Sequence, residues 1–371
     1  MQKKIKIVYD HQIFTHQIFG GISRCFSTLF KEFLINKQAD FSLPLLISNN
    51  SYISKIKEIA PWNFLPKQNF KGKVSAINII NNLYTNYFLK NNKNFDIFHP
   101  TYHSPYFLNH LNDKPYVMTI HDMIQEEKTN EIPGAIKYTE QKKQLALKAS
   151  AIIAPSNATK EKIISKYNFI DKSKIFVVHH APPKKVKPCA NKLNINSDFF
   201  LYVGHRLQYK NFNKLLSGFS QLIKKYPKIK LICAGGTSFT EDEKLIINNL
   251  NCHNNIFQMN VNDQELAWCY SNSLAYISPS LCEGFGIPIL EAFMYSCPIL
   301  LSAISCFHEV AEDAAIYFDP CKTDEIYNSL SKVISSKLLR NELIQKGNIR
   351  LNAFSTQKNC NEILNIYKKI I

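Results

Sequence analysis

Short apolar segments alternate with longer amphipathic segments along the first half of the chain. The apolar segments end in polar residues or proline, as buried strands do, and they are residues 5–10, 95–100, 116–122 and 150–156. Between them, residues 20–34 place Phe26, Leu29 and Phe33 on one face at helical spacing, and residues 137–149 form another helical segment. This alternation predicts a parallel sheet with crossover helices.

The same pattern restarts after residues 177–198, which are rich in proline and lysine and lack periodicity. The strands expected there are residues 199–204, 230–236, 255–260, 274–280 and 298–302. The helices expected between and after them are residues 211–226, 241–250, 263–272, 288–297, 323–336 and 356–371. We therefore predict two doubly wound, Rossmann-like α/β domains that face each other across a cleft, with the ligand in that cleft at the carboxyl ends of the strands.

The domain boundaries follow from these segments. We predict an N-terminal domain over 1–180, a linker over 181–198 and a C-terminal domain over 199–355. The last segment, 356–371, is expected to be a helix that packs back on the N-terminal domain.

The charge balance narrows the class of partner. Lys and Arg outnumber Asp and Glu by 45 to 29, which gives a net charge of +16 and favours an anionic partner such as a nucleotide, a nucleic acid or an anionic lipid surface. The lysines are scattered and no nucleic-acid-binding motif is present, so we expect no nucleic acid. A salt-dependent gel shift would revive that alternative.

Cysteine usage and hydropathy indicate the compartment. The ten cysteines lie singly and without zinc-ligand spacing, which is typical of a reducing cytosol. No apolar stretch approaches the roughly 18 residues that a membrane span needs. We expect a cytoplasmic protein that is soluble or peripheral on the inner face of the membrane.

Two polar clusters follow predicted strands of the first half. The segment FGGISR places Gly20 and Gly21 at a helix start, where exposed N–H groups favour an anion, although such glycines also serve loops that need a positive φ. The segment TIHDM places His121 and Asp122 at the end of a strand. His121 either hydrogen-bonds a sugar hydroxyl or phosphate, or is a satisfied buried imidazole beside a helix cap.

Two further clusters follow strands of the second half. In YVGHRLQYKNF, Arg206 and Lys210 lie four apart where the next helix begins, a pairing suited to a diphosphate, unless both are solvated surface charges. In EGFGIPILE, Pro288 predicts a helix over 288–296, with Glu283 in the loop before it and Glu291 in its first turn. Each carboxylate can accept from vicinal hydroxyls of a different sugar, while main-chain N–H groups and the Arg206/Lys210 pair hold phosphates.

These segments, with APSNATK and VNDQELAWCYSNSLAYISPS, resemble retaining glycosyltransferases of family 4 (glycosyltransferase group 1), and among them the bacterial O-antigen and capsule mannosyltransferases. The resemblance spans nearly the whole chain in the family's order. It implies the GT-B fold, with acceptor binding by the N-terminal domain and nucleotide-sugar binding by the C-terminal domain. It also implies transfer with retention of configuration in lipopolysaccharide biosynthesis.

The resemblance assigns roles to individual residues. Its catalytic set is His121, near the sugar, Glu283, which holds hydroxyls of the transferred sugar, and Arg206 and Lys210, which hold the diphosphate. The donor-binding set adds Glu291 on the ribose, the main chain of the glycine-rich loop and the two glycines beside the phosphates: Gly20, Gly21, Gly284, Phe285, Gly286 and Ile287. Arg206 and Lys210 are closer in sequence than in some relatives, and Ser156 fits a helix N-cap.

The resemblance further suggests GDP-mannose as the donor and a glycan or lipid-linked saccharide as the acceptor. The chain has no Asp-x-Asp motif, so we expect neither a metal nor a cofactor. A UDP-sugar-dependent transferase, another nucleotide-sugar enzyme on this fold such as an epimerase, and a non-catalytic glycan binder are the alternatives. Residues 76–90 form either a core helix or an amphipathic helix that meets an anionic membrane.

Overall fold

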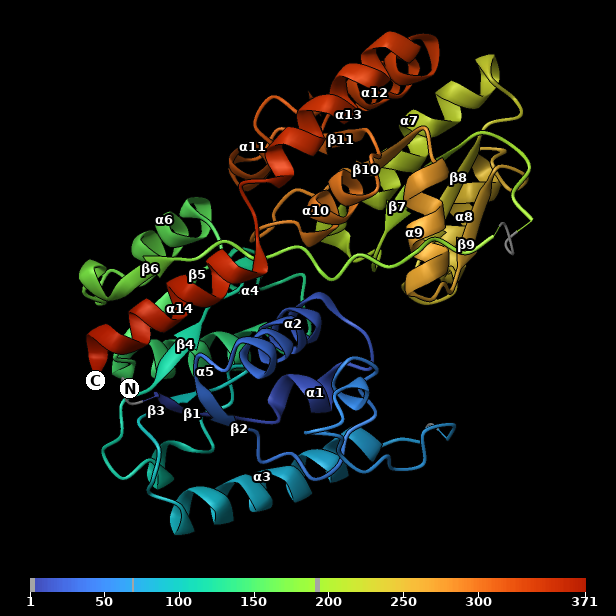
Figure 1. The fold of residues 1–371 in the computed structure, drawn as a ribbon. Coiled ribbons are helices and arrows are strands. Elements are labelled where there is room, and N and C mark those ends of the chain that lie inside the picture. The colour runs from blue at the N-terminus through green and yellow to red at the C-terminus, as the bar shows by residue number, and fades with distance from the viewer. Residues whose placement is uncertain (1–3, 69, 191–193) are drawn as a thin grey trace. The chain divides into compact units, whose positions relative to one another are not determined.

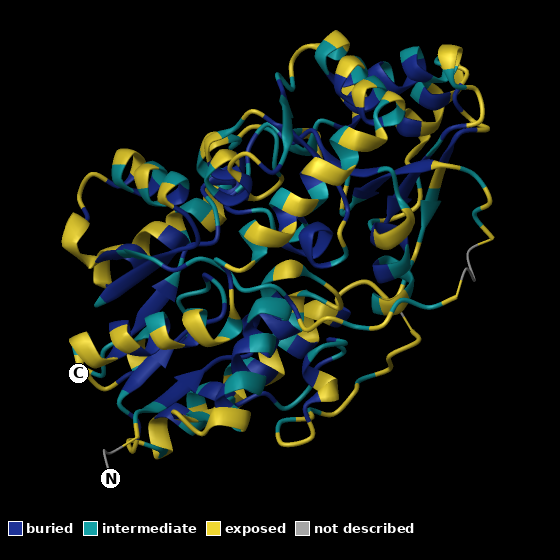
Figure 2. Cartoon of the chain, turned by 45° about the horizontal axis from the view of Figure 1, so that its top comes forward, coloured by how far each residue is buried: buried dark blue, intermediate teal, exposed yellow. Residues whose placement is uncertain are grey.

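The computed structural model describes residues 4–68, 70–190 and 194–371. The chain divides into two compact units, of which the first comprises Met1–Pro183 and Ser355–Ile371 and the second Lys184–Phe354. Each unit is built on parallel strands with helices packed around them (Figure 1). Figure 2 shows the strands mainly buried, whereas the helices carry their exposed residues on the outside.

Six short parallel strands lie in the described residues of the first unit. They are β1 (Lys6–Tyr9), β2 (Asp40–Ser42), β3 (Ile97–His99), β4 (Val117–Thr119), β5 (Ala151–Ala154) and β6 (Ile175–Val177). Two three-stranded sheets, β2-β1-β3 and β4-β5-β6, are joined by a parallel bridge between Phe98 and Tyr116. Alternate residues of β1 face different cores: Ile7 and Tyr9 pack with α2, and Val8 packs on the other side.

The helices of the first unit include the C-terminal helix of the chain. They are α1 (Gln12–His16), α2 (Gly21–Asn36), α3 (Lys73–Asn91), α4 (Ile124–Glu127), α5 (Ala135–Lys148), α6 (Asn157–Lys166) and α14 (Thr356–Ile370), with short 3-10 turns at Ile53–Lys55, Leu108–His110 and Lys172–Lys174. Helix α14 packs against α2, and its buried side, with Ile363 and Tyr367, belongs to the same core as Phe30. The apolar residues at helical spacing along α14 thus pack into the core of this unit.

The second unit has one six-stranded parallel sheet in the order β12-β11-β10-β7-β8-β9. Its strands are β7 (Phe199–Val203), β8 (Lys230–Ala234), β9 (Ile256–Met259), β10 (Ala275–Ser278), β11 (Ile299–Ser302) and β12 (Ile316–Phe318). Its helices are α7 (Phe212–Lys225), α8 (Glu241–Asn249), α9 (Asp263–Asn272), α10 (Ile287–Met294), α11 (Ser305–Ala311), α12 (Thr323–Ser335) and α13 (Lys337–Leu351), with a 3-10 turn at Gln208–Lys210. Buried runs such as Phe199–Val203 are continuous because both sheet faces are covered.

The segment expected as a linker, 181–198, includes residues 191–193, which lie outside the described residues. From Lys184 onward this segment belongs to the second unit, in which the Val186 N–H donates to Tyr295 Oη at 3.0 Å and the Cys189 N–H donates to the Gln264 carbonyl at 3.2 Å.

Candidate functional site

Two loops of the second unit follow neighbouring strands at the point where the strand order of the sheet reverses. The chain leaves β7 toward β8 on one side and later returns to β10 on the other side of β7. Loops that follow two such strands diverge and leave a crevice at the carboxyl ends, where open α/β sheets bind ligands. The loop after β7 carries Arg206 and Lys210, and the loop after β10 carries Glu283.

Lys210 and Glu283 form the polar pair that joins these loops. Lys210 Nζ donates to Glu283 Oε1 at 2.5 Å, and Ser280 Oγ donates to the same oxygen at 2.8 Å. The side chains of Lys210 and Glu283 keep 23% and 14% of their surface exposed, so a ligand can reach both. The pair offers a cation for an anionic group and a carboxylate for hydroxyls, side by side.

Arg206 is bound differently from Lys210. Its Nε donates to Glu243 Oε1 at 2.8 Å, and its Nη2 donates to the Thr237 carbonyl at 2.6 Å. The guanidinium also lies over the rings of Phe239 and Phe212, at 4.7 and 5.6 Å from their centroids. Only 3% of the side chain is exposed, so Arg206 is not a solvated surface charge. Its buried Nη1 has no partner within the described part of the chain.

Glu291 lies one helical position later than the sequence suggests. Helix α10 begins at Ile287, not Pro288, because Gly286 takes the cap position with a φ of 98°. Glu291 is therefore the fifth helical residue, and the prediction that it lies in the first turn is wrong. Its carboxylate is buried, 5% exposed, and Oε2 accepts from Tyr270 Oη at 3.0 Å. Burial, followed by the charge of Glu291, raises the pKa of Tyr270 well above its usual value, so this phenol remains a donor.

Gly286 is required where it stands. Besides its positive φ, a Cβ at this position would lie 2.9 Å from both Ile289 Cδ1 and Phe307 Cε1. Phe285, 3% exposed, packs edge-to-face on Phe354 with ring centroids 5.9 Å apart. The loop before α10 is thus fixed by packing.

The helix start with two glycines is capped from within. Gly20 is the N-cap of α2 and Gly21 its first residue, and Gln17 Oε1 accepts from the Ser23 N–H at 3.1 Å. A Cβ on Gly20 would overlap the Gln17 side chain, because its Oε1 would be 2.2 Å away. A side chain here would displace Gln17 and break its bond to Ser23, and one N–H of this helix start is already bonded.

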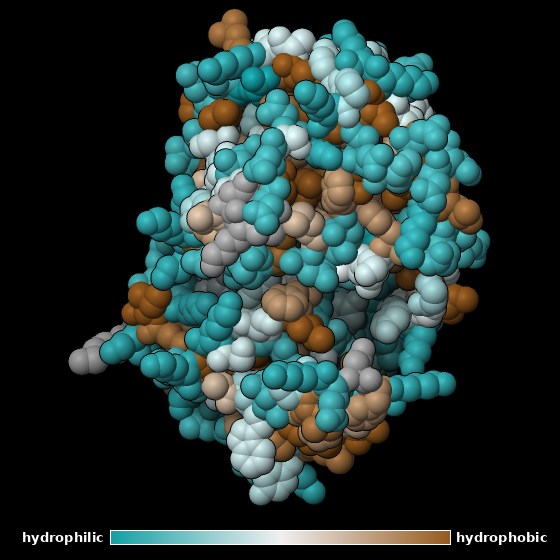
Figure 3. Space-filling view, turned by 90° about the vertical axis from the view of Figure 1, so that its right-hand side faces the viewer, coloured by the Kyte–Doolittle hydropathy of each residue, from teal (hydrophilic) through white to brown (hydrophobic). Residues whose placement is uncertain are grey.

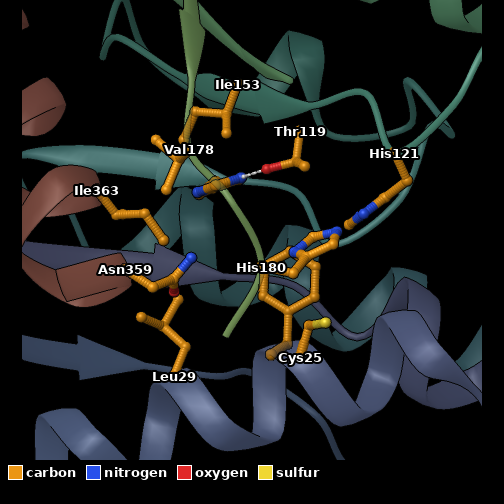
Figure 4. A pocket seen from close by; sticks show the side chains of 11 residues that line it. Cys25, Leu29, Thr119, His121, Ile153, Val178, His180, Asn359 and Ile363 are labelled. Atoms are coloured by element: carbon orange, nitrogen blue, oxygen red, sulfur yellow. Dashed lines mark hydrogen bonds between the residues drawn. The ribbon is translucent and has the colours of Figure 1, made fainter. Parts of the chain in front are cut away.

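His121 lies in a cavity of about 30 Å³ at the carboxyl ends of strands in the first unit (Figure 4). The lining residues come from α2, the ends of the strands, and α14: Cys25, Phe26, Leu29, His99, Thr119, His121, Ile153, Val178, His180, Asn359 and Ile363. The rings of His121 and His180 lie against each other, with centroids 5.5 Å apart. A cavity of this size holds an ordered water or the hydroxyl group of a ligand.

Both ring nitrogens of His121 are buried and have no hydrogen-bond partner among the described residues. His121 is only 8% exposed. Because its buried nitrogens are unsatisfied, it is not the satisfied buried imidazole that the sequence allowed. Burial, then the neighbouring His180, His103 and His99, lowers the pKa of His121 well below its ordinary value. The imidazole is therefore neutral at pH 7 and presents one donor and one acceptor. Asp122 Oδ1 accepts from the Ile124 N–H at 3.1 Å, but the N-cap of α4 is Met123, so Asp122 precedes the cap position.

The sequence did not reveal the companions of His121. His99 Nδ1 bonds Tyr367 Oη at 2.5 Å and its Nε2 bonds Thr119 Oγ1 at 3.0 Å, while Tyr367 Oη also bonds Tyr9 Oη at 2.8 Å. Asn359 Nδ2 donates to the His179 carbonyl at 2.7 Å. Position at the end of a strand for His99 and after a strand for His180 is a usable signal, but nothing in the sequence places α14 beside them.

The described residues are also compatible with neither a metal cluster nor a membrane-spanning helix. Across residues 4–68, 70–190 and 194–371, no group of three or more His, Cys, Asp or Glu side chains is arranged to hold a metal ion. In that same described part, none of the helices combines the length and hydropathy of a membrane span.

Each of the two units matches a family of known proteins. Residues 184–350 match the family described as glycosyl transferases group 1, and residues 56–181 match Glycosyltransferase Family 4. The chain is 29% identical over 170 residues to the O-antigen chain mannosyltransferase RfbU of Salmonella typhimurium, a match that covers 46% of each chain. The matched region thus spans less than half of that curated relative.

Solved structures match over the full length. The sucrose-phosphate synthase of Thermosynechococcus elongatus aligns with a TM-score of 0.75 at 16% identity, covering 99% of both chains. HepE of Anabaena in complex with UDP and glucose aligns with a TM-score of 0.73 at 14% identity, covering 98% of this chain and 100% of the other. Both likenesses concern the fold, which is GT-B, as predicted. The chain belongs to glycosyltransferase family 4, the group 1 glycosyl transferases.

Proposed function

We propose that this protein is a retaining hexosyltransferase that moves mannose from GDP-mannose to a glycan or lipid-linked acceptor in O-antigen-type polysaccharide assembly. The observation that carries the proposal is the Lys210–Glu283 pair at the switch point of the second unit. The family supports glycosyl transfer, and the name of the Salmonella relative supports mannose and O-antigen.

In this proposal the second unit binds the donor. Lys210 leaves Glu283 to contact the diphosphate, and Glu283 then accepts from hydroxyls of the transferred sugar. Main-chain N–H groups of Gly284, Phe285, Gly286 and Ile287, at the N-terminal end of α10, lie against the phosphates. Such preorganised cations and N–H groups stabilise the charge that develops on a leaving diphosphate.

Glu291 and Arg206 have supporting parts in the donor site. Glu291, held by Tyr270, accepts from the ribose hydroxyls. Arg206 fixes the loop after β7 through Glu243, and its one unpartnered atom, Nη1, donates to the diphosphate. We assign the direct electrostatic contact chiefly to Lys210, because most donors of Arg206 are already engaged.

The first unit binds the acceptor and a sugar hydroxyl. The neutral ring of His121, with two unpartnered nitrogens, hydrogen-bonds a sugar hydroxyl that enters the cavity. The glycine-rich start of α2, with Gly20 and Gly21, lies beside the phosphates. Cationic side chains and N–H groups neutralise the leaving group, so we propose that transfer needs neither a metal nor a cofactor. None of the ten cysteines, all of which lie in the described residues, forms a disulfide, which fits a cytoplasmic enzyme.

A screen of nucleotides by thermal shift and calorimetry tests the donor. We expect GDP-mannose at 100 times its dissociation constant to stabilise the protein by about 2.7 kcal/mol. UDP- and ADP-sugars at the same concentration should stabilise it less. Binding of no nucleotide sugar would overturn the proposal. The anomeric proton of the product, followed by NMR, tests retention, since an inverted product would exclude it.

A second candidate is a UDP-sugar-dependent transferase, favoured by the likeness to HepE, whose structure contains UDP and glucose. Preferential stabilisation by UDP and a UDP-sugar in the same screen would select it. An epimerase would release a free product of altered stereochemistry without an acceptor.

A further inference from the structure

Helix α3 of the first unit carries polar residues on its buried side. Its buried positions include Ile77, Asn81, Thr85 and Leu89, four residues apart, so that two of these four are polar. A core helix normally buries an apolar stripe. The helix is therefore not the ordinary core helix that one interpretation of residues 76–90 expected.

The buried polar groups fix which side faces inward. Asn81 Oδ1 accepts from the Ile47 N–H at 3.0 Å, and its Nδ2 donates to the Ile47 carbonyl at 2.8 Å. Thr85 Oγ1 donates to the Pro44 carbonyl at 2.9 Å. Rotating the helix about its axis would leave these buried groups without partners, which is unfavourable. The opposite side is consequently held toward solvent.

That opposite side is apolar, and we call it the outer face of α3: Ile79, Ile80, Leu83, Tyr84 and Tyr87. Ile79, Leu83 and Tyr87 are 59%, 66% and 67% exposed. The segment before the helix adds exposed Leu65 and Phe70, and Lys73 Nζ donates to the Leu65 carbonyl at 2.8 Å to hold it. Figure 3 shows apolar side chains gathered at the lower end of the molecule, where Figure 1 draws α3.

The charged residues in the stretch of chain that carries the outer face all have one sign. Residues 59–95 contain no Asp or Glu, while four lysines of this stretch are exposed: Lys67, Lys71, Lys90 and Lys93. Tyrosine side chains on the same helix suit the boundary between water and lipid, where an aromatic ring and a hydroxyl are both satisfied. Apolar side chains flanked by lysines are the pattern of a helix that lies in an anionic membrane surface.

We propose that the outer face of α3 docks the protein on an anionic lipid bilayer, with Leu83 and Tyr87 in the headgroup region and the four lysines on lipid phosphates. A second copy of the chain fits the surface less well, because two lysine-flanked faces would repel each other. The proposal is independent of sugar transfer, since its measurements need no donor or acceptor.

The test is flotation of the full chain with vesicles. The wild type should bind phosphatidylcholine vesicles that contain phosphatidylglycerol more tightly than vesicles of phosphatidylcholine alone, and less tightly as salt rises. Leu83→Glu should lower binding roughly tenfold or more, since it replaces a large apolar side chain with a charge. Leu338→Glu is the matched control, because Leu338 is 81% exposed in the second unit and should have no effect.

Charge and insertion are tested separately. Lys90→Gln with Lys93→Gln should lower binding about 25-fold, at roughly fivefold for each lysine near the surface, whereas Lys224→Gln with Lys225→Gln should not. In a chain whose two tryptophans are replaced by phenylalanine, Tyr87→Trp should show a blue shift of emission on vesicle binding, and Leu338→Trp should show none.

Three results would overturn the proposal. One is a wild-type chain, folded by circular dichroism, that does not bind anionic vesicles at low salt. Another is equal loss of binding in the Leu83 and Leu338 variants. The third is dimerisation in sedimentation that Leu83→Glu abolishes, which would assign the face to a second copy of the chain.

Discussion

Replacement of Arg206 by alanine should lower the free energy of unfolding of the second unit, whether or not a donor is bound. The side chain is buried against Glu243, with an Nε–Oε1 distance of 2.8 Å and exposures of 3% and 11% for the two side chains. It also donates to the Thr237 and Ser238 carbonyls through Nη2. Alanine would leave the Glu243 carboxylate partly buried without its cation.

The size of the effect follows from that geometry. Removing one partner of a buried ion pair costs about 3–5 kcal/mol, much of it from the charge left behind. Glu243 keeps its bond from the Thr240 N–H, at 2.8 Å, in the capping box of α8, which favours the lower end of that range. Loss of the contacts with the Phe212 and Phe239 rings acts in the opposite direction. We expect a loss of about 3–4 kcal/mol in the free energy of unfolding.

Urea unfolding measures this effect. With Trp62 replaced by phenylalanine, the remaining tryptophan, Trp268, reports on the second unit alone. Lys244→Ala is the matched control, because Lys244 pairs with Glu241 of the same helix in an exposed ion pair and should change stability by less than about 0.5 kcal/mol.

A double-mutant cycle isolates the ion pair. Arg206→Ala and Glu243→Gln, separately and together, should give a coupling energy above about 1.5 kcal/mol. If Arg206→Ala costs less than about 1 kcal/mol, or the two changes are additive, the guanidinium is not held as described. Arg206 would then be a mobile side chain that binds the diphosphate, as the sequence resemblance implied.

Three further predictions concern binding, chemistry and pH. Glu291→Ala should weaken donor binding about 10- to 150-fold in calorimetry, since a lost charged hydrogen bond costs roughly 1.5–3 kcal/mol, and unchanged affinity would exclude the ribose contact. Transfer should survive saturating EDTA, and loss of activity that manganese restores would refute the metal-free mechanism. Burial lowers the pKa of His99 and His103 to about 3 and of His180 to about 4, so the unfolded chain alone binds these protons below about pH 6.5. Stability should therefore fall between about pH 6.5 and 4, by about 1.4 kcal/mol per pH unit for each histidine, and a pH-independent unfolding midpoint would contradict this.

Much of the fold could be predicted because burial leaves a direct mark on the sequence. Strands such as β5 and β10 are covered on both sides and appear as continuous apolar runs. The short strands β2 and β12 and the short helix α11 were not predicted, because three to seven residues carry too little periodicity. Helix α13 was missed for another reason, since it buries little beyond Leu343 and Gly347.

The candidate site was predictable in its position more than in its contacts. Position after a predicted strand is enough to select Lys210, Glu283 and His121 as candidate site residues from the sequence alone. The bond of Arg206 to Glu243 joins residues 37 apart through side chains that face inward, which local sequence does not record. The same is true of Tyr367, which reaches His99 across 268 residues. For helix α3 the sequence leaves a core helix and a membrane-facing helix open, because its buried side combines hydrogen-bonded Asn81 and Thr85 with apolar residues such as Leu89.

The central claim is that Glu283 and Lys210 together form a sugar-transfer site. The most direct test is mass spectrometry of the products formed from GDP-mannose and lipid-linked saccharide acceptors. The account predicts that the wild type adds one hexose to an acceptor. It also predicts that Glu283→Gln and Lys210→Ala each lower the rate about 100- to 1000-fold, the loss expected for one electrostatic group at the reacting centre. Both variants should keep the wild-type urea midpoint for the second unit, since the pair is partly exposed. Transfer at the wild-type rate by either stable variant would contradict the account.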